Sequence, residues 1–75
     1  MPADYAEYRE AAKHLGLAIK RKRSALGLSL ETVGDRTGLR WKEISDLESG
    51  DATVPLGVLL AVAAALDIKM GIDEA

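Results

Sequence analysis

Residues 35–46 read DRTGLRWKEISD, and this short stretch decides how the chain folds. Gly38 comes after a helical pattern and suits the left-handed backbone that a tight turn requires. From about Arg40 to Ser49 the apolar residues Ile44 and Leu47 recur at helical spacing, so we expect them to face inward. The polar and charged residues between them then face outward. The stretch therefore predicts two helices joined by a tight turn, the second with one buried and one polar face.

The composition is that of one small globular domain. The chain has 75 residues, of which 48% are hydrophobic, and it has no cysteine. Disulfides and thiolate metal sites are therefore excluded, and a core this small is often supported by a partner. The single histidine, His14, is interpreted as an ordinary helix residue. With no nucleophile–base pair and no phosphate-binding glycine loop in the sequence, we expect no enzyme activity, no metal and no cofactor.

The sequence has no predicted membrane segment. Its N-terminus lacks the basic and then apolar run of a signal peptide. The longest apolar run, residues 55–66, is shorter than the ~20 residues that cross a bilayer. We expect a cytoplasmic protein without membrane contact.

The charges are distributed unevenly along the chain. The net charge is −2, yet residues 9–42 contain nine basic and three acidic residues. Residues 43–75 contain seven acidic residues and one lysine. Because salt screens charges beyond ~8 Å, an acidic average is compatible with a basic face.

The first helix is predicted to run from a cap at Asp4 to a stop at Gly27. Its inward face repeats every three or four residues and consists of Tyr5, Tyr8, Ala12, Leu15, Ile19 and Leu26. The four cations from Lys20 to Arg23 cover a full turn, so they cannot all point one way. This run is either a solvated basic face or a set of phosphate contacts.

Two further helices are predicted around the opening stretch. Ser29 is a good N-cap for a helix whose inward residues are Leu30 and Val33. Pro55 suits the first turn of the last helix, which extends through Leu66. This last helix is apolar nearly all round, whereas a surface helix of a monomer shows a polar stripe. We therefore expect it to be covered on more than one side.

The C-terminal residues 66–73 alternate between apolar and polar or small, the period of a half-buried strand. A short helix with Gly71 in its middle is the alternative. A lone strand leaves backbone groups unpaired, so we expect antiparallel pairing with a second copy about a twofold axis. The predicted dimer interface consists of Leu59, Val62, Leu66, Ile68, Met70 and Ile72.

A specific register of residues runs from Leu15 to Ile68: Leu15-Gly16, Ile19, Arg23, Gly27-Leu28-Ser29-Leu30, Val33, Gly38-Leu39, Ile44-Ser45, Leu47-Glu48, Gly50, Pro55, Leu59, Ala63 and Ala65-Leu66. This register resembles the Xre/Cro-type helix-turn-helix family of bacterial and phage repressors. The resemblance implies an all-α, lambda-repressor-like bundle of four to five helices. Residues 1–14 would extend the first helix, residues 15–66 would form the DNA-binding domain, and residues 67–75 would form a dimerising tail. That tail resembles the HipB-like antitoxin branch, whose members end in a strand paired across the dimer.

The resemblance also implies which residues would contact DNA. In this fold the third helix enters the major groove while the second lies across the backbone. The implied base-reading residues are Arg40, Trp41, Lys42, Ser45 and Asp46. The implied phosphate contacts are Lys20, Lys22, Ser29, Leu30 and Arg36. In similar proteins the positions of Arg23 and Glu48 form a structural ion pair between the first helix and the end of the third.

The side chains of the reading helix favour particular bases. Lys42 or Arg40 can donate to guanine, and Asp46 can accept from cytosine N4. The sequence contains no Asn or Gln, so the bidentate amide contact to adenine is absent and we expect a preference for G·C pairs. Trp41 either folds over the flank of the core or covers sugar and thymine methyl groups, and Asp46 alternatively only solvates the helix. Family members commonly have Gln at the position of Leu30, so one side-chain phosphate contact is missing.

The expected function is therefore that of a homodimeric repressor of a palindromic operator in double-stranded DNA. A narrower version is an antitoxin that also grips a toxin protein. The alternative is a helix-turn-helix-shaped protein-interaction module with little DNA affinity, which the acid-rich second half and Leu30 favour.

Overall fold

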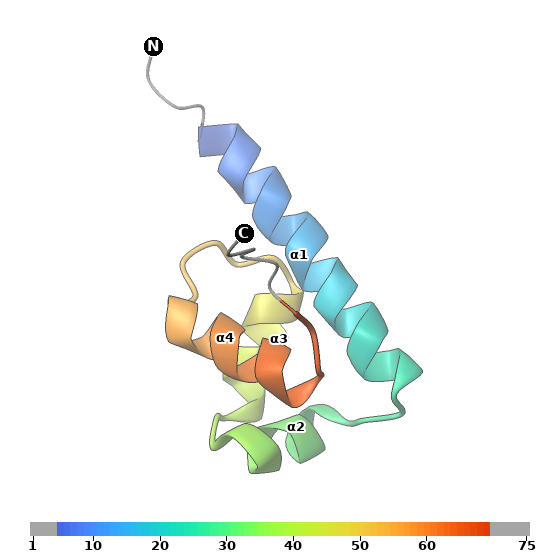
Figure 1. The fold of residues 1–75 in the computed structure, drawn as a ribbon. Helices are drawn as coiled ribbons and strands as arrows, with labels where there is room; N and C mark the ends of the chain where they lie inside the picture. Colours follow the sequence, from blue (N-terminus) through green and yellow to red (C-terminus); the bar gives the residue numbers. More distant parts are fainter. Residues whose placement is uncertain (1–4, 70–75) are drawn as a thin grey trace, which may run out of the picture.

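The computed structural model describes residues 5–69, and these form four helices without a strand (Figure 1). The helices are α1 (Tyr5–Ala25), α2 (Leu30–Thr37), α3 (Trp41–Glu48) and α4 (Leu56–Ala65). The three short helices gather beside the C-terminal half of α1, while its N-terminal end projects beyond them (Figure 1). The all-helical bundle is confirmed for the described residues.

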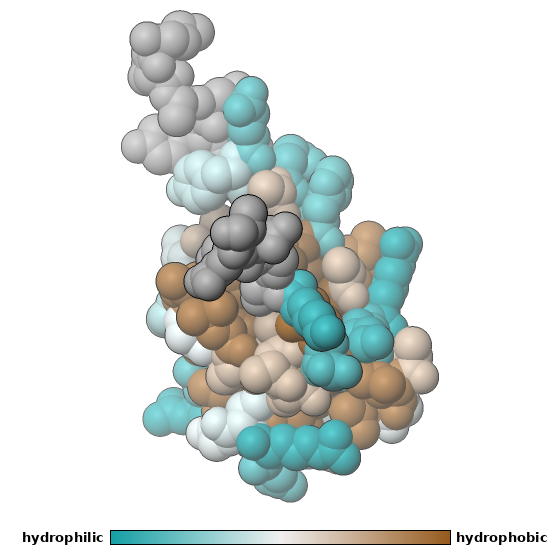
Figure 2. All heavy atoms as spheres, in the orientation of Figure 1, coloured by the Kyte–Doolittle hydropathy of each residue, from teal (hydrophilic) through white to brown (hydrophobic). Residues whose placement is uncertain are grey.

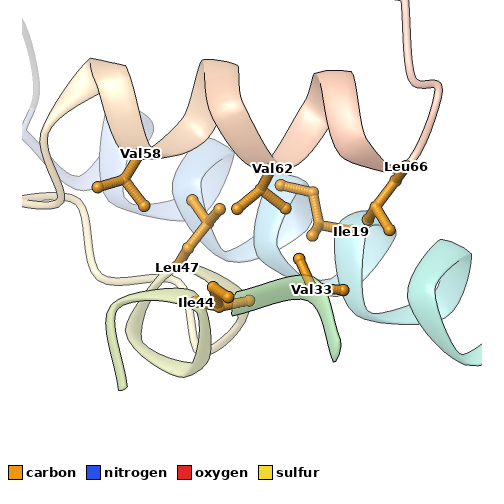
Figure 3. Packing of buried hydrophobic residues seen from close by; sticks show 7 residues of the cluster. All are labelled: Ile19, Val33, Ile44, Leu47, Val58, Val62 and Leu66. Carbon is orange, nitrogen blue, oxygen red and sulfur yellow. The ribbon is translucent and has the colours of Figure 1, made fainter. Parts of the chain in front are cut away.

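All four helices contribute to one apolar core. Its buried members are Ile19, Val33, Ile44, Leu47, Val58, Val62 and Leu66. Figure 3 shows Val58, Val62 and Leu66 pointing down from α4 and its end toward the side chains of α2 and α3. Burying a side chain of this size contributes ~1.5–3 kcal/mol. The inward face of α3, Ile44 and Leu47, is thus anchored as the sequence predicts.

The ends of α2 follow the predicted capping pattern. The Oγ of Ser29 accepts a hydrogen bond from the backbone N–H of Thr32 at 3.0 Å. At the other end Gly38 adopts a φ of 78°, and its N–H donates to the carbonyl of Gly34 at 2.8 Å. A side chain at Gly38 would strain this left-handed backbone, so glycine ends the helix here.

A close approach of α1 to α3 depends on Gly16. A Cβ added at this position would lie 2.5 Å from the carbonyl oxygen of Leu47 and 2.7 Å from that of Glu48. Only a residue without a side chain allows this spacing. The contact places the C-terminal end of α3 directly against α1.

Two residues of the predicted inward face of α1 do not reach the core. Tyr8 and Leu26 are each 48% exposed. Tyr8 lies on the projecting end of α1. This helix has 21 residues, whereas α2 and α4 have 8 and 10, so its N-terminal end extends beyond the helices that could cover it. Leu26 follows the last residue of α1, where its N–H donates to the carbonyl of Lys22 at 3.0 Å. The helical spacing of apolar residues therefore predicted burial wrongly near both ends of this helix.

The predicted C-terminal strand is not found in residues 67–69. Asp67 adopts a φ of 57°, its N–H donates to Ala64 at 3.2 Å, and the N–H of Ile68 donates to Ala63 at 2.8 Å. These paired bonds form a Schellman motif that ends α4 and turns the chain back. The half-buried Ile68 packs against the core. The rest of the predicted strand, from Met70 onward, lies outside the described residues.

The predicted dimer interface is wrong at two of its residues. Val62 and Leu66 are each 0% exposed within a single chain, so they belong to the core. Leu59 and Ile68 are half-buried, and Met70 and Ile72 lie outside the described residues. Both faces of α4 are apolar, so hydropathy alone could not show which one turns inward.

Candidate nucleic-acid interface

The connection between α2 and α3 is a short turn held by side-chain hydrogen bonds. The Oγ1 of Thr37 donates to the carbonyl of Val33 at 2.8 Å and accepts from the N–H of Leu39 at 3.2 Å. A Cβ added at Gly34 would lie 2.8 Å from the carbonyl oxygen of Leu39, so the turn folds closely back onto α2. These contacts hold the start of α3 close to the end of α2.

The two faces of α3 differ sharply in burial. Ile44 is 0% exposed and Leu47 is 6% exposed, whereas Trp41 is 55% exposed. Lys42 is exposed beside Trp41, as is the N-cap residue Arg40. Ser45 and Asp46, the other two predicted base-reading residues, are partly buried one turn further on. The N-terminal end of α3 is thus the part that projects into solvent.

Trp41 is accessible at the start of α3. More than half of its surface is exposed, which argues against the interpretation in which its indole folds over the flank of the core. Just behind it, the N–H of Arg40 donates to the Oε1 of Glu43 at 2.9 Å. Glu43 therefore stabilises the helix start, and the guanidinium of Arg40 takes no part in that bond.

The predicted ion pair between Arg23 and Glu48 is present and mostly buried. The Nε of Arg23 donates to Glu48 Oε2 at 2.6 Å and its Nη2 to Oε1 at 2.9 Å, while Nη1 donates to the carbonyl of Leu28 at 2.8 Å. The hydrogen-bonded carboxylate of Glu48 raises the pKa of Arg23, although burial acts in the opposite direction. This bidentate pair joins the end of α3 to α1 and to the α1–α2 connection.

Arg23 and Glu48 also line a hollow of about 190 Å³ to which α1, α2 and α3 contribute. Its lining includes Lys20 from α1, Leu30 from α2 and Ser45 from α3. Two predicted phosphate contacts and one predicted base-reading residue thus surround one space. Ser29, Lys22 and Arg36 are exposed but do not line it.

A comparison with known protein families agrees with this geometry. The model of the helix-turn-helix family (HTH_3) matches residues 19–72, which include α2, α3 and α4. The chain belongs to the Xre/Cro-like helix-turn-helix family. Domains of this family are DNA-binding regulators and generally not enzymes. No protein of curated function matches the chain. None of the helices in residues 5–69 is long and apolar enough to cross a membrane.

The outward face of the helix-turn-helix carries a weak ion pair. The Nζ of Lys42 lies 3.4 Å from the Oδ1 of Asp46, one helical turn away. The two side chains are 72% and 41% exposed, so solvent screens their attraction and its contribution to stability is ~0–1 kcal/mol. Either group can leave the pair at little cost in stability.

Sequence reasoning missed an acidic hollow beside the helix-turn-helix. This hollow of about 160 Å³ is lined by Glu43 and Asp46 of α3 and by Asp51 of the following loop. The hydroxyl and N–H of Thr53 both donate to Asp51, at 2.6 and 2.8 Å, and hold the pKa of its carboxyl below the usual range. An Asp followed two residues later by Thr is a known turn pattern and was the available signal. Among the described residues no group of acidic, His or Cys side chains is arranged to hold a metal ion.

Proposed function

We propose that this helix-turn-helix protein is a cytoplasmic repressor that binds a palindromic operator in double-stranded DNA as a homodimer. One observation carries the proposal. The N-terminal end of α3 exposes Trp41 and Lys42, while Ile44 on the opposite face is completely buried. A helix held in this way can enter the major groove without any rearrangement of the core.

The exposed side chains of α3 are suited to reading G·C pairs. The guanidinium of Arg40 and the ammonium of Lys42 donate to guanine O6 and N7, and Asp46 accepts from cytosine N4. Ser45 serves as donor or acceptor at an adjacent base. The indole of Trp41 covers sugar or thymine methyl groups at the edge of the site.

The proposed phosphate contacts come from α1 and α2. Backbone N–H groups in the first turn of α2, next to Ser29 and Leu30, have no partner within the helix and are suited to binding a phosphate. Lys20, Lys22 and Arg36 are exposed and supply positive charge. A twofold axis doubles these contacts, which compensates for the net charge of −2 on each chain.

A second candidate function, that of a protein-interaction module, is favoured by the acidic hollow. Glu43 and Asp46 of the reading helix gather with Asp51 of the following loop, and their charges would repel phosphates. The half-buried Leu30 also offers no side-chain contact to DNA. A toxin bound by an antitoxin of this family branch is one form of such a partner, and an adjacent toxin-like gene would favour it.

Selection from random duplexes at two salt concentrations separates the two functions. A repressor retains a selected palindrome, richer in G·C at the contacted positions, and loses affinity steeply as salt rises. Six to ten phosphate contacts predict a loss of ~10³–10⁵ in affinity between 50 and 200 mM salt. Weak binding at low salt with no enriched sequence would overturn the repressor and favour the interaction module.

A further inference from the structure

The side of α4 that faces away from the core is an exposed apolar stripe. Leu56 is 66% exposed and Leu60 is 48% exposed, and Ala64 is exposed at the next position of the same spacing. Residues four apart lie on one face of a helix, so these three form a continuous line. Figure 2 shows hydrophobic side chains gathered over the N-terminal end of α4. All ten residues of α4 are apolar, so the stripe carries no charge to keep it in water.

We infer that this stripe, Leu56, Leu60 and Ala64, pairs with the same stripe of a second copy, antiparallel about a twofold axis at Leu60. The inference refines the homodimer part of the proposed function by naming the surface that forms it. It also replaces the interface predicted from sequence, two of whose residues lie in the core.

The sizes of the side chains fit this self-pairing. With the axis at Leu60, Leu56 of one chain lies opposite Ala64 of the other, and the two Leu60 side chains meet at the centre. A large residue therefore faces a small one at each end, which is the alternation that lets two helices interdigitate. Because the stripe has no charged group, a partner recognised by charge is a poor match, whereas an identical apolar stripe leaves no polar group unpaired.

The apolar surface continues into a hollow at the N-terminal end of α4. This hollow of about 180 Å³ is lined mainly by apolar groups, including Ala12 and Leu15 of α1 and Leu56 and Leu59 of α4. In the antiparallel pair Ala64 of the second copy faces Leu56, so the C-terminal end of the partner's α4 lies beside this hollow.

The size of the stripe predicts a weak dimer. A stable interface buries ~800 Å² on each partner, more than two partly exposed leucines supply. The two chains should therefore exchange rapidly in solution and pair fully only at high concentration or on DNA. Since α3 and α4 share one core, pairing through α4 also fixes the distance between the two reading helices.

Sedimentation equilibrium without DNA tests the pairing. The wild-type chain is expected to show a monomer–dimer equilibrium. Leu60→Glu places two carboxylates face to face on the axis and should raise the dimer dissociation constant roughly 100-fold or more. Leu26→Glu is the matched control, because Leu26 is also 48% exposed but lies beyond the end of α1. Circular dichroism checks that both variants fold.

Opposite charges at the axis give a second test. Leu60→Glu and Leu60→Lys should each be monomeric alone and associate when mixed, since residue 60 faces residue 60. The chain has no cysteine, so any disulfide between two chains must form between the engineered positions and reports that these positions meet. Leu60→Cys should form a disulfide dimer by itself, whereas Leu56→Cys should do so only when mixed with Ala64→Cys.

The outcomes separate this inference from the proposed function. A wild-type chain that stays monomeric at every concentration, or a dimer equally unaffected by Leu60→Glu and Leu26→Glu, overturns the pairing through α4. If the dimer is unaffected by both substitutions, the proposal of a homodimeric repressor is retained, and its interface lies elsewhere. A dimer that Leu60→Glu dissociates, in a chain that selects no duplex, supports the pairing and overturns the repressor.

Discussion

The helices α3 and α4 are neighbours in one core, yet their outward faces are opposites. The outward face of α3 presents Trp41 and the Lys42–Asp46 ion pair, while its inward face is Ile44 and Leu47. In α4 both faces are apolar, and only burial distinguishes Val62 from Leu60. A polar face opposite a buried one is usual for a solvated surface helix and leaves α3 free to meet a polar ligand, as the proposed function requires. A continuous apolar face left exposed is unusual in a monomer and favours contact with protein, as the inferred pairing through α4 requires.

The largest expected effect is a difference in the free energy of unfolding between substitutions on the two faces of α4. Leu66→Ala removes a side chain that is 0% exposed and leaves a cavity, which should destabilise the fold by about 4 kcal/mol. Leu60→Ala, on the exposed face, should change stability by less than about 0.5 kcal/mol in the monomer. Urea unfolding at low protein concentration measures both. Equal losses for the two variants would show that α4 is not divided in this way.

The next effect concerns the anchor at the end of α3. Arg23→Met leaves the carboxylate of Glu48, whose side chain is only 6% exposed, without its partner and should cost ~3 kcal/mol. The double variant Arg23→Glu with Glu48→Arg should be more stable than the two single reversals predict. Thermal and urea unfolding supply the four free energies of the cycle. Strict additivity would show that the pair is not coupled.

A smaller effect tests the outward face of α3. Lys42→Ala should relax base preference by ~1–3 kcal/mol at one position in each half-site. Lys22→Ala is the control, since a phosphate contact should weaken all duplexes alike and lower the salt dependence. Binding to a panel of single-base operator variants distinguishes the two. An even loss across the panel for Lys42→Ala would show that this lysine contacts only phosphate.

The smallest effect is at the end of α4. Asp67 adopts the left-handed conformation, in which a side chain is unfavourable, so Asp67→Gly should raise stability by up to about 1 kcal/mol. Ala65→Gly, at the last residue of the helix, should lower it by up to a similar amount. Thermal unfolding of the two variants gives the comparison. A destabilising Asp67→Gly would mean that the carboxylate makes a contact more important than the backbone strain.

The difference between α3 and α4 also explains what the sequence could predict. In α3 the helical spacing of apolar residues among polar ones identified Ile44 and Leu47 as core. Ser29 and Gly38 identified the two ends of α2. The family resemblance implied the Arg23–Glu48 pair, which is present. These features depend on local chemistry that differs from one position to the next.

Features that depend on tertiary contacts were predicted less well. The apolar pattern of α4 did not show which of its faces turns inward. Val62 and Leu66 were therefore assigned to a dimer interface, although they belong to the core. The period of two after Leu66 predicted a strand, but the Schellman motif at Asp67 produces a similar pattern by turning Ile68 back onto the core. The acidic hollow is lined by residues of α3 and of the loop that follows it. A hydropathy pattern cannot show that these residues lie close together in the fold.

Amide chemical-shift mapping with a selected duplex tests most directly that α3 reads DNA. Addition of the duplex should shift the N–H signals of residues 29–32 and 40–46, the start of α2 and the exposed end of α3. Higher salt should reverse these shifts as phosphate contacts are lost. Changes confined to the loop around Asp51, with signals from Trp41 and Lys42 unmoved at saturation, would contradict a reading role for α3.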